Sequence, residues 1–323
     1  MFLEIEHHLS FAYDSYIRES FLELRMQPKT TPHQNLSSFV LAVGPPTKVS
    51  RYRDWNDNAV HHFTIVSFHD RIEVGARSLV HTAPTGPGLA AATDRPGAGP
   101  EPPYALFDFL QFGGPVRNSA ALRTFAHEAA VAADATLGEQ VAAYGRHIGA
   151  HMTYRKHVTR YDSTTDDVLQ IKSGVCQDFT HLMLGLLRLR RIPCRYVSGY
   201  LHVEAEEGEV AQSHAWIELY SSVAGWIPFD PTHDREIDER YVVVGHGRHY
   251  DDVPPNKGIY RGNADEALEA QVVTRVSAPK AISALYEEME HIDVPVYPDI
   301  PERRRDRGIA IIEGPPEQEQ QQQ

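Results

Sequence analysis

Cysteine is scarce in this sequence, and long apolar runs are absent. Its 323 residues include only two cysteines, Cys176 and Cys194, too few for the disulfide framework of small secreted domains. A disulfide between them would use up the thiol of Cys176, which is a candidate for a reactive group. A reducing, cytoplasmic setting is therefore the simpler expectation. Residues 1–8 hold acids and histidines where a signal peptide needs a positive end and an apolar core. No apolar stretch reaches transmembrane length, so we expect no membrane partner.

Positive charge is also in short supply. Lysine and arginine number 31 against 44 acidic residues, a net charge of −13 with histidine neutral. This excess argues against nucleic acid or an anionic membrane as the main partner, although a local basic patch stays compatible with it. With 41% hydrophobic and 23% charged residues, the composition is that of an ordinary soluble protein. The length is enough for two domains.

Four segments of different character follow one another. Residues 1–82 contain short alternating, β-branched or aromatic runs, which predict a small antiparallel β domain with a hairpin turn at residues 69–71. Residues 83–103 are rich in proline and glycine and predict a linker or surface loop that holds no regular element. Residues 104–300 predict a larger α+β domain, and the glutamine-rich end of residues 301–323 predicts a disordered tail.

Apolar spacing within the larger domain predicts helices first and strands later. Helices are expected near 118–133, 141–152, 165–171 and 176–191. Strands are expected at 194–203, 214–220, 226–229, 242–244 and 271–276, with a solvated hairpin loop at 204–209.

Cys176 has two interpretations. An isolated cysteine is usually a small buried core residue. Here, however, Gly174 permits a tight turn and a helix is predicted to begin at the thiol. The unpaired amides and positive dipole of a helix start lower a thiol pKa and can hold a developing oxyanion.

An imidazole and a carboxylate follow Cys176 in the chain. His214 lies in an alternating strand on the same face as Trp216, and Asp230 ends the next strand before Pro231. Taken alone, His214 is a surface strand histidine and Asp230 is a turn residue. Taken together, a thiol, an imidazole and a carboxylate in this order favour nucleophilic cysteine chemistry.

Four separated motifs, in order, resemble the transglutaminase-like superfamily in its bacterial branch. The match is dense over roughly residues 150–235, and the N-terminal strands resemble the β region that precedes the core in that branch. The motifs are Gly174-Val175-Cys176-Gln177-Asp178-Phe179, Ile192-Pro193-Cys194-Arg195-Tyr196-Val197-Ser198-Gly199-Tyr200, Ser213-His214-Ala215-Trp216 and Trp226-Ile227-Pro228-Phe229-Asp230-Pro231-Thr232.

The resemblance implies a papain-like α+β core, in which a helix that bears the cysteine packs on an antiparallel sheet. It assigns Cys176 as nucleophile, His214 as base and Asp230 as the residue that orients the imidazole. The reaction implied is acyl transfer on a peptide or protein amide, by transamidation or hydrolysis, without a cofactor and with no calcium loop in view. A noncatalytic peptide-binding module is the alternative. Tyr154, Gln177 and Trp216 are expected at the substrate cleft, although Trp216 could instead pack beside His214.

The histidines allow a third interpretation. His246, His249 and Asp251 could imitate a metal cluster, but their loop context makes a metal the less favoured interpretation, and no metal ligand is assigned. Cys194 is expected in the core. The oligomeric state has no signal in the sequence.

Overall fold

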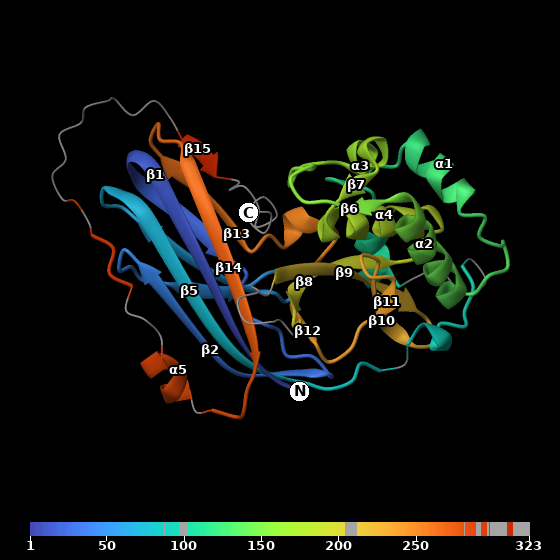
Figure 1. Cartoon of the computed structure of the whole chain (residues 1–323), viewed down its shortest axis with the longest axis horizontal. Coiled ribbons are helices and arrows are strands. Elements are labelled where there is room, and N and C mark those ends of the chain that lie inside the picture. The colour runs from blue at the N-terminus through green and yellow to red at the C-terminus, as the bar shows by residue number, and fades with distance from the viewer. Residues whose placement is uncertain are drawn as a thin grey trace.

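The computed structural model has two units side by side, one built on a large curled sheet and one in which helices cover a smaller sheet (Figure 1). It describes residues 1–86, 88–96, 103–203, 212–280, 282–288, 292–295, 297 and 309–312. The predicted loop at 204–209 and most of the predicted tail lie outside these residues. Among the described residues, no helix is long and apolar enough to cross a membrane.

The first unit is an eight-stranded antiparallel sheet organised around its longest strand. Its strands are β1 (Phe2–Leu24), β2 (Gln34–Gly44), β3 (Ser50–Arg53), β4 (Ala59–Ile65), β5 (His69–Thr82), β13 (Asn256–Arg261), β14 (Glu266–Val276) and β15 (Ile309–Ile312). The first half of β1 pairs with β5 and β14, and its second half pairs with β4 and β13. The register breaks between Ala12 and Ile17, where β1 passes from one set of partners to the other.

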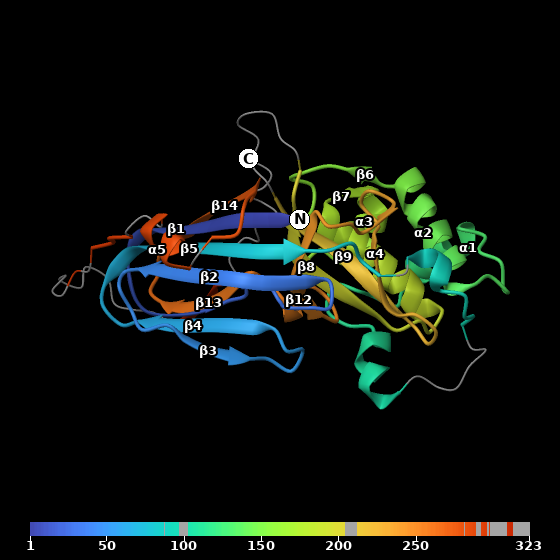
Figure 2. The ribbon, with the colours of Figure 1, turned by 90° about the horizontal axis from the view of Figure 1, so that it is seen from below.

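This pairing corrects the predicted domain limits. The strand expected at 271–276, within the unit of residues 104–300, lies in β14, and β13 was not predicted. Both pair with β1, and β14 is seen beside it (Figure 2). The physical reason is the length of β1, because residues 1–82 supply too few strands to cover both of its edges. The predicted turn at residues 69–71 is also wrong, because β5 begins at His69 and the chain turns before it.

The second unit has a five-stranded antiparallel sheet in the order β11-β10-β9-β8-β12. Its strands are β8 (Cys194–Leu201), β9 (Gln212–Ser221), β10 (Gly225–Asp230), β11 (Arg235–Glu236) and β12 (Tyr241–Gly247). The helices are α1 (Ala120–Glu128), α2 (Leu137–His151), α3 (Thr165–Ile171) and α4 (Cys176–Leu189), with a small parallel pair formed by β6 (Thr153–Tyr154) and β7 (Ser173–Gly174). Helix α1 ends earlier than predicted because Ala130 adopts a left-handed φ of 49°.

Helix α4 is the centre of the second core. Almost all of its side chains are buried, and it shares one apolar cluster with Ala215, Ile217 and Leu219 on one face of β9. Each fully buried leucine of this helix contributes roughly 2 kcal/mol relative to an exposed one. Arg191, with a φ of 56°, and Pro193 then end the helix. The core therefore fixes the start of α4 over the sheet.

The segment between the two units is not a free linker. Of its described part, residues 89–91 form a 3₁₀ turn, which the prediction of no regular element missed. Thr85 donates to the carbonyl of Ile237, and the Asp94 carboxylate accepts from Ser221 at 2.6 Å. A Leu-Ala-Ala run without proline or glycine explains the turn.

Side chains of the first unit also bond to the backbone of β12. The Gln34 carboxamide exchanges two hydrogen bonds with Val243, at 2.8 and 2.7 Å. The Asn58 carboxamide does the same with His246, at 2.8 Å in each direction. Buried hydrogen bonds between side-chain carboxamides and the backbone, such as these, fix the two units against each other.

Three short helices complete the described elements. They are the 3₁₀ helices η2 (Tyr104–Leu110) and η3 (Tyr250–Asp252) and the helix α5 (Ile282–Glu288). Leu285 of α5 packs on Val40 and Leu79 of the first sheet.

Candidate active site

Cys176 is the first residue of α4, as predicted. The turn that delivers it is tight, because a Cβ added at Gly174 would lie 2.5 Å from Oδ2 of Asp178. The same carboxylate oxygen accepts the amide N–H of Val175 at 2.8 Å, which caps the helix. The amides of Cys176 and Gln177 have no acceptor inside the helix, whereas that of Asp178 bonds to the carbonyl of Val175 at 3.0 Å. The positive end of α4 therefore lies at Cys176, which is 7% exposed.

His214 lies between the thiol and the carboxylate. Strand β9 holds it between β8 and β10, and its Nε2 lies 2.8 Å from Oδ2 of Asp230. Cys176 lies close enough to the imidazole to raise its pKa. Burial alone would lower the pKa of His214, but the Asp230 carboxylate and then Cys176 raise it above its ordinary value. The pair therefore favours a charged imidazole beside the sulfur.

Asp230 is fully buried at the end of β10, yet its carboxylate stays charged. Oδ2 also accepts the Tyr241 hydroxyl at 2.8 Å and lies 2.7 Å from Nδ1 of His233, while Oδ1 accepts the amide of Thr232 at 2.8 Å. Burial would raise the pKa of Asp230, but His214 and then His233 hold it far below its ordinary value. The structure thus brings Cys176, His214 and Asp230 together in one group.

Sequence reasoning missed Tyr241 and His233. Tyr241 reaches Asp230 only because β12 pairs with β8 at the far edge of the sheet, a long-range pairing without a local signal. His233 is three residues beyond Asp230, so the turn that Asp230 was expected to make could have suggested the contact.

The three residues expected at the cleft occupy different places. Tyr154 is 42% exposed and pairs with Gly174, two residues before the thiol-bearing Cys176. Burial and then the charges of Cys176 and Asp178 raise its pKa. Gln177 is buried, and its amide donates to the carbonyl of Tyr161 at 2.8 Å. Trp216 has no exposed surface and packs edge-on against Tyr241. The expectation that Trp216 walls the cleft is therefore wrong, because the ring supports His214 from within the core.

The residues considered for a metal cluster are not gathered into one. Among the described residues, only His214, Asp230 and His233 bring three ligand atoms within 4.8 Å of one another. All three are already engaged in the hydrogen bonds around Asp230. His249 instead lies 3.4 Å from Asp251, in a separate loop.

We expect Cys176 to be alkylated at least about tenfold faster than Cys194 at pH 6. Cys194 has no exposed surface, and burial raises its pKa to about 11, so almost none of it is thiolate. Cys176 has a charged partner in His214. Limited iodoacetamide treatment with peptide mapping measures both rates, with Cys176→Ala as the control for slow labelling of Cys194. Equal labelling of the two thiols would contradict the assignment of the nucleophile.

Replacing Asp178 by asparagine is expected to flatten the pH dependence of stability between about pH 4 and 6. Burial raises the pKa of Asp178 to about 6, although bonds from Val175 and Thr159 oppose the shift. Because the folded pKa lies above the unfolded one, folding favours the protonated acid, and stability falls as pH rises through this window. Between pH 4 and 7, the unfolding free energy of the wild type should fall by roughly 1–3 kcal/mol relative to that of Asp178→Asn. Urea denaturation at several pH values measures this difference. A constant difference from pH 4 to 7 would show that Asp178 keeps an ordinary pKa.

Comparison with known proteins gives a consistent assignment. The model of the transglutaminase-like superfamily matches residues 123–231, and that of the bacterial transglutaminase-like N-terminal region matches residues 3–81. An uncharacterized protein of Mycobacterium leprae is 32% identical over 297 residues, which cover 85% of this chain and 99% of that protein. A protein-glutamine gamma-glutamyltransferase of Pseudomonas aeruginosa is 27% identical over 121 residues, 34% of this chain and 18% of its own.

A solved structure shares the whole fold. The Cytophaga hutchinsonii protein described as a "Putative Cysteine Protease" matches with a TM-score of 0.68 over 96% of this chain and 97% of that one, at 17% identity. With the sequence matches and the cysteine-bearing helix on an antiparallel sheet, the chain belongs to the transglutaminase-like superfamily and carries its bacterial N-terminal region.

Proposed function

We propose that the protein is a cysteine-dependent enzyme that transfers acyl groups from peptide or protein amides through a thioester. The observation that carries the proposal is the position of His214, which lies beside Cys176 and is hydrogen-bonded to the buried Asp230 carboxylate. A binding module needs no such chain of groups, whereas nucleophilic catalysis requires each of them.

The first half of the reaction forms the thioester. The sulfur of Cys176 attacks the carbonyl carbon of the amide, and a C–S bond forms while the carbonyl oxygen takes up negative charge. The amide N–H groups of Cys176 and Gln177, at the start of α4, can stabilise that charge. His214 then gives its proton to the leaving nitrogen, the C–N bond breaks, and ammonia or an amine departs.

The second half returns the thiol. His214 takes a proton from water or from an incoming amine, whose oxygen or nitrogen attacks the thioester carbon and breaks the C–S bond. Water completes a hydrolysis and an amine completes a transamidation. The names of the Pseudomonas and Cytophaga proteins correspond to these two outcomes for those proteins. The acceptor that reaches the thioester decides the outcome here.

Tyr154 is the side chain that we place at the border of the cleft. It lies in β6, which pairs with β7 directly before the catalytic cysteine, so its ring is held beside the helix start. Its exposed surface and its proximity to Cys176 suit a residue that contacts the substrate next to the reacting amide.

The test is a screen of amide and peptide substrates with mass spectrometry of the intact protein. A substrate of the enzyme should add the mass of its acyl group to the peptide that contains Cys176, and Cys176→Ala should carry no adduct. Adding a primary amine should release the adduct as a new amide if transamidation is available. Peptides that bind without ever forming an adduct on the wild-type thiol would favour the noncatalytic alternative.

A further inference from the structure

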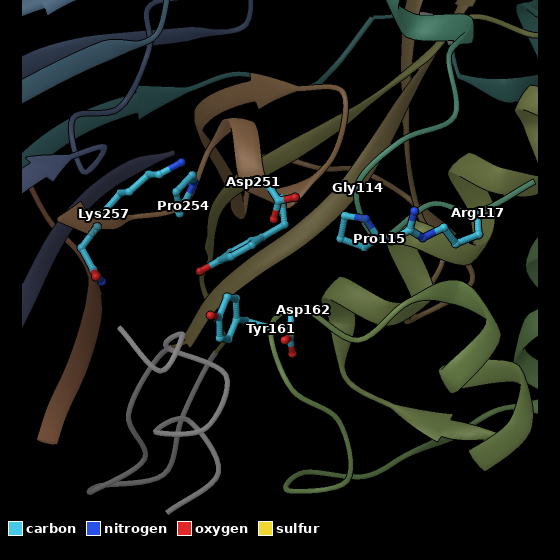
Figure 3. A pocket seen from close by; sticks show the side chains of 10 residues that line it. Gly114, Pro115, Arg117, Tyr161, Asp162, Asp251, Pro254 and Lys257 are labelled. Atoms are coloured by element: carbon cyan, nitrogen blue, oxygen red, sulfur yellow. The ribbon is translucent and has the colours of Figure 1, made fainter. Parts of the chain in front are cut away.

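A cavity of about 210 Å³ opens where the two units meet (Figure 3). Its walls come from β13, from the loop before α1, from the loop that leads to α3, and from η3. Tyr161 and Tyr250 supply aromatic surface, and Lys257 and Arg117 lie toward opposite ends (Figure 3). The volume suits one or two amino-acid residues of a longer chain rather than a large cofactor.

The cavity is tied to the helix that bears the nucleophile. Gln177, the residue after Cys176, donates to the carbonyl of Tyr161 at 2.8 Å. One turn later, His181 accepts the amide N–H of Tyr250 at 3.2 Å. Both aromatic walls are therefore hydrogen-bonded to the first two turns of α4.

The acids of the cavity have cationic neighbours, but the cations lack equivalent partners. Asp162 lies 3.3 Å from Arg160, and Asp251 lies 3.4 Å from His249. Within the described residues, no hydrogen bond or ion pair engages the side chain of Lys257. The chain has 44 acidic residues against 31 lysines and arginines, yet none of those described pairs with Lys257, so this cation is available to an acid from outside the cavity.

The acidic residue opposite Lys257 already interacts with other side chains. Glu23 faces Lys257 across β1 and β13, but its carboxylate accepts the Tyr52 hydroxyl at 2.6 Å and pairs with Arg25 at 3.3 Å. Arg117, at the other end, is attracted by the charge of Asp167. Lys257 is thus an exposed cation at the cavity that no acidic side chain of the described residues engages in an ion pair.

Asn256 is a second and independent sign of a ligand. It lines the cavity and is nine-tenths buried, yet within the part of the chain that the structure describes no hydrogen bond engages its carboxamide. Its polar atoms are not among the buried atoms that lack a partner, so the carboxamide reaches the solvent of the cavity and is available to a ligand.

The backbone of Asn256 and Lys257 pairs with β1 on one side, and its other side has no strand partner in the described part of the chain. Strand β15 pairs with β13 from Arg261 to Gly258 and, among the described residues, no strand continues that pairing to Lys257. An extended peptide can add to such an edge through backbone hydrogen bonds.

We infer that the Asn256–Lys257 end of this cavity binds an extended peptide through one of its carboxylates. The carboxylate meets the Lys257 ammonium, the Asn256 carboxamide bonds to the peptide, and the tyrosines cover the neighbouring residue. This inference rests on the proposed function only where it calls the peptide a substrate, since the site then selects amides with an acidic residue nearby. Binding itself requires no reaction.

The experiment measures binding in the full-length Cys176→Ala protein, which cannot turn over the ligand. Two blocked fluorescent pentapeptides are compared, with glutamate or glutamine in the middle position and glycine elsewhere. The glutamate peptide should bind about five- to tenfold more tightly, the range of one charge-assisted bond at a partly exposed site. Lys257→Met should abolish this preference, and Asn256→Leu should weaken both peptides.

Two matched variants separate the site from general charge effects. Lys48→Met removes the same charge from an exposed position that does not line the cavity, and it should keep the preference. Arg117→Met alters the opposite end and should keep it too. Equal binding of the two peptides, or a preference that depends on Arg117 or Lys48 instead of Lys257, would overturn the inference.

The chain itself contains another source of carboxylates. Glu313, Glu317 and Glu319 follow β15 in the sequence. The glutamate peptide could bind only after all three are replaced by glutamine in the full-length chain. In that case the cavity binds a carboxylate of the same chain, and the assignment to a substrate peptide fails. Unchanged binding in that triple variant supports a ligand from another molecule. None of these outcomes requires amide turnover, so a failure here is distinct from a failure of the proposed function.

Discussion

Cys176→Ala is expected to lower kcat/KM for any amide substrate by on the order of 10⁴-fold or more. The alanine removes the only atom that can form the thioester, and the remaining groups can only polarise a bound amide. His214→Ala should be nearly as damaging, because the sulfur then loses its charged partner and the leaving nitrogen loses its proton donor. The measurement is kcat/KM for both variants with the best substrate of the screen.

The matched control for this loss is the second cysteine. Cys194 is buried in the same apolar core, and its thiol donates only to the carbonyl of Leu184 at 3.6 Å. Cys194→Ala should therefore keep kcat/KM within a few-fold, at a modest cost in stability. A loss in Cys194→Ala as large as that in Cys176→Ala would show that the first loss reflects the fold and not the nucleophile.

The second unit was predictable because its signals are local. The apolar stripe of α4, the glycine before Cys176 and the alternation in β9 each lie within a few residues, and together they place the thiol and imidazole correctly. The first unit was harder, since β13 and β14 join β1 from more than 200 residues away. No local pattern specifies which distant strand fills a sheet edge.

The environment of Asp230 also could not be predicted fully from local sequence patterns. Its place at the end of β10 follows from the sequence, but the Tyr241 hydroxyl arrives from β12 and completes the hydrogen bonds. Trp216 is the converse case, because alternation put it on the face of His214 without revealing that other strands bury that face. The cytoplasmic location and the peptide or protein partner stay predictions.

Asp230→Asn is expected to lower kcat/KM by on the order of 10²- to 10⁴-fold without unfolding the protein. Oδ2 accepts a hydrogen bond from the Tyr241 hydroxyl and contacts the rings of two histidines, while Oδ1 accepts a hydrogen bond from the amide of Thr232. An asparagine has one acceptor oxygen, so its NH₂ group must face either that amide or the other three groups. His214 then loses its anion and its fixed tautomer. Circular dichroism should confirm that the variant keeps its secondary structure.

Combining His214→Ala with Asp230→Asn separates a triad from two independent contributions. If Asp230 acts only through the imidazole, the double variant should lose little more than His214→Ala alone. Tyr241→Phe removes one of the hydrogen bonds to Oδ2 and leaves the carboxylate charged, so it should lower kcat/KM by a smaller factor, about tenfold. In the His214→Ala background, the same substitution should have no further effect on kcat/KM. Multiplicative losses in the double variant would mean that Asp230 contributes independently of His214, and the buried carboxylate would then be a structural anchor for β12 instead of the group that orients the catalytic imidazole.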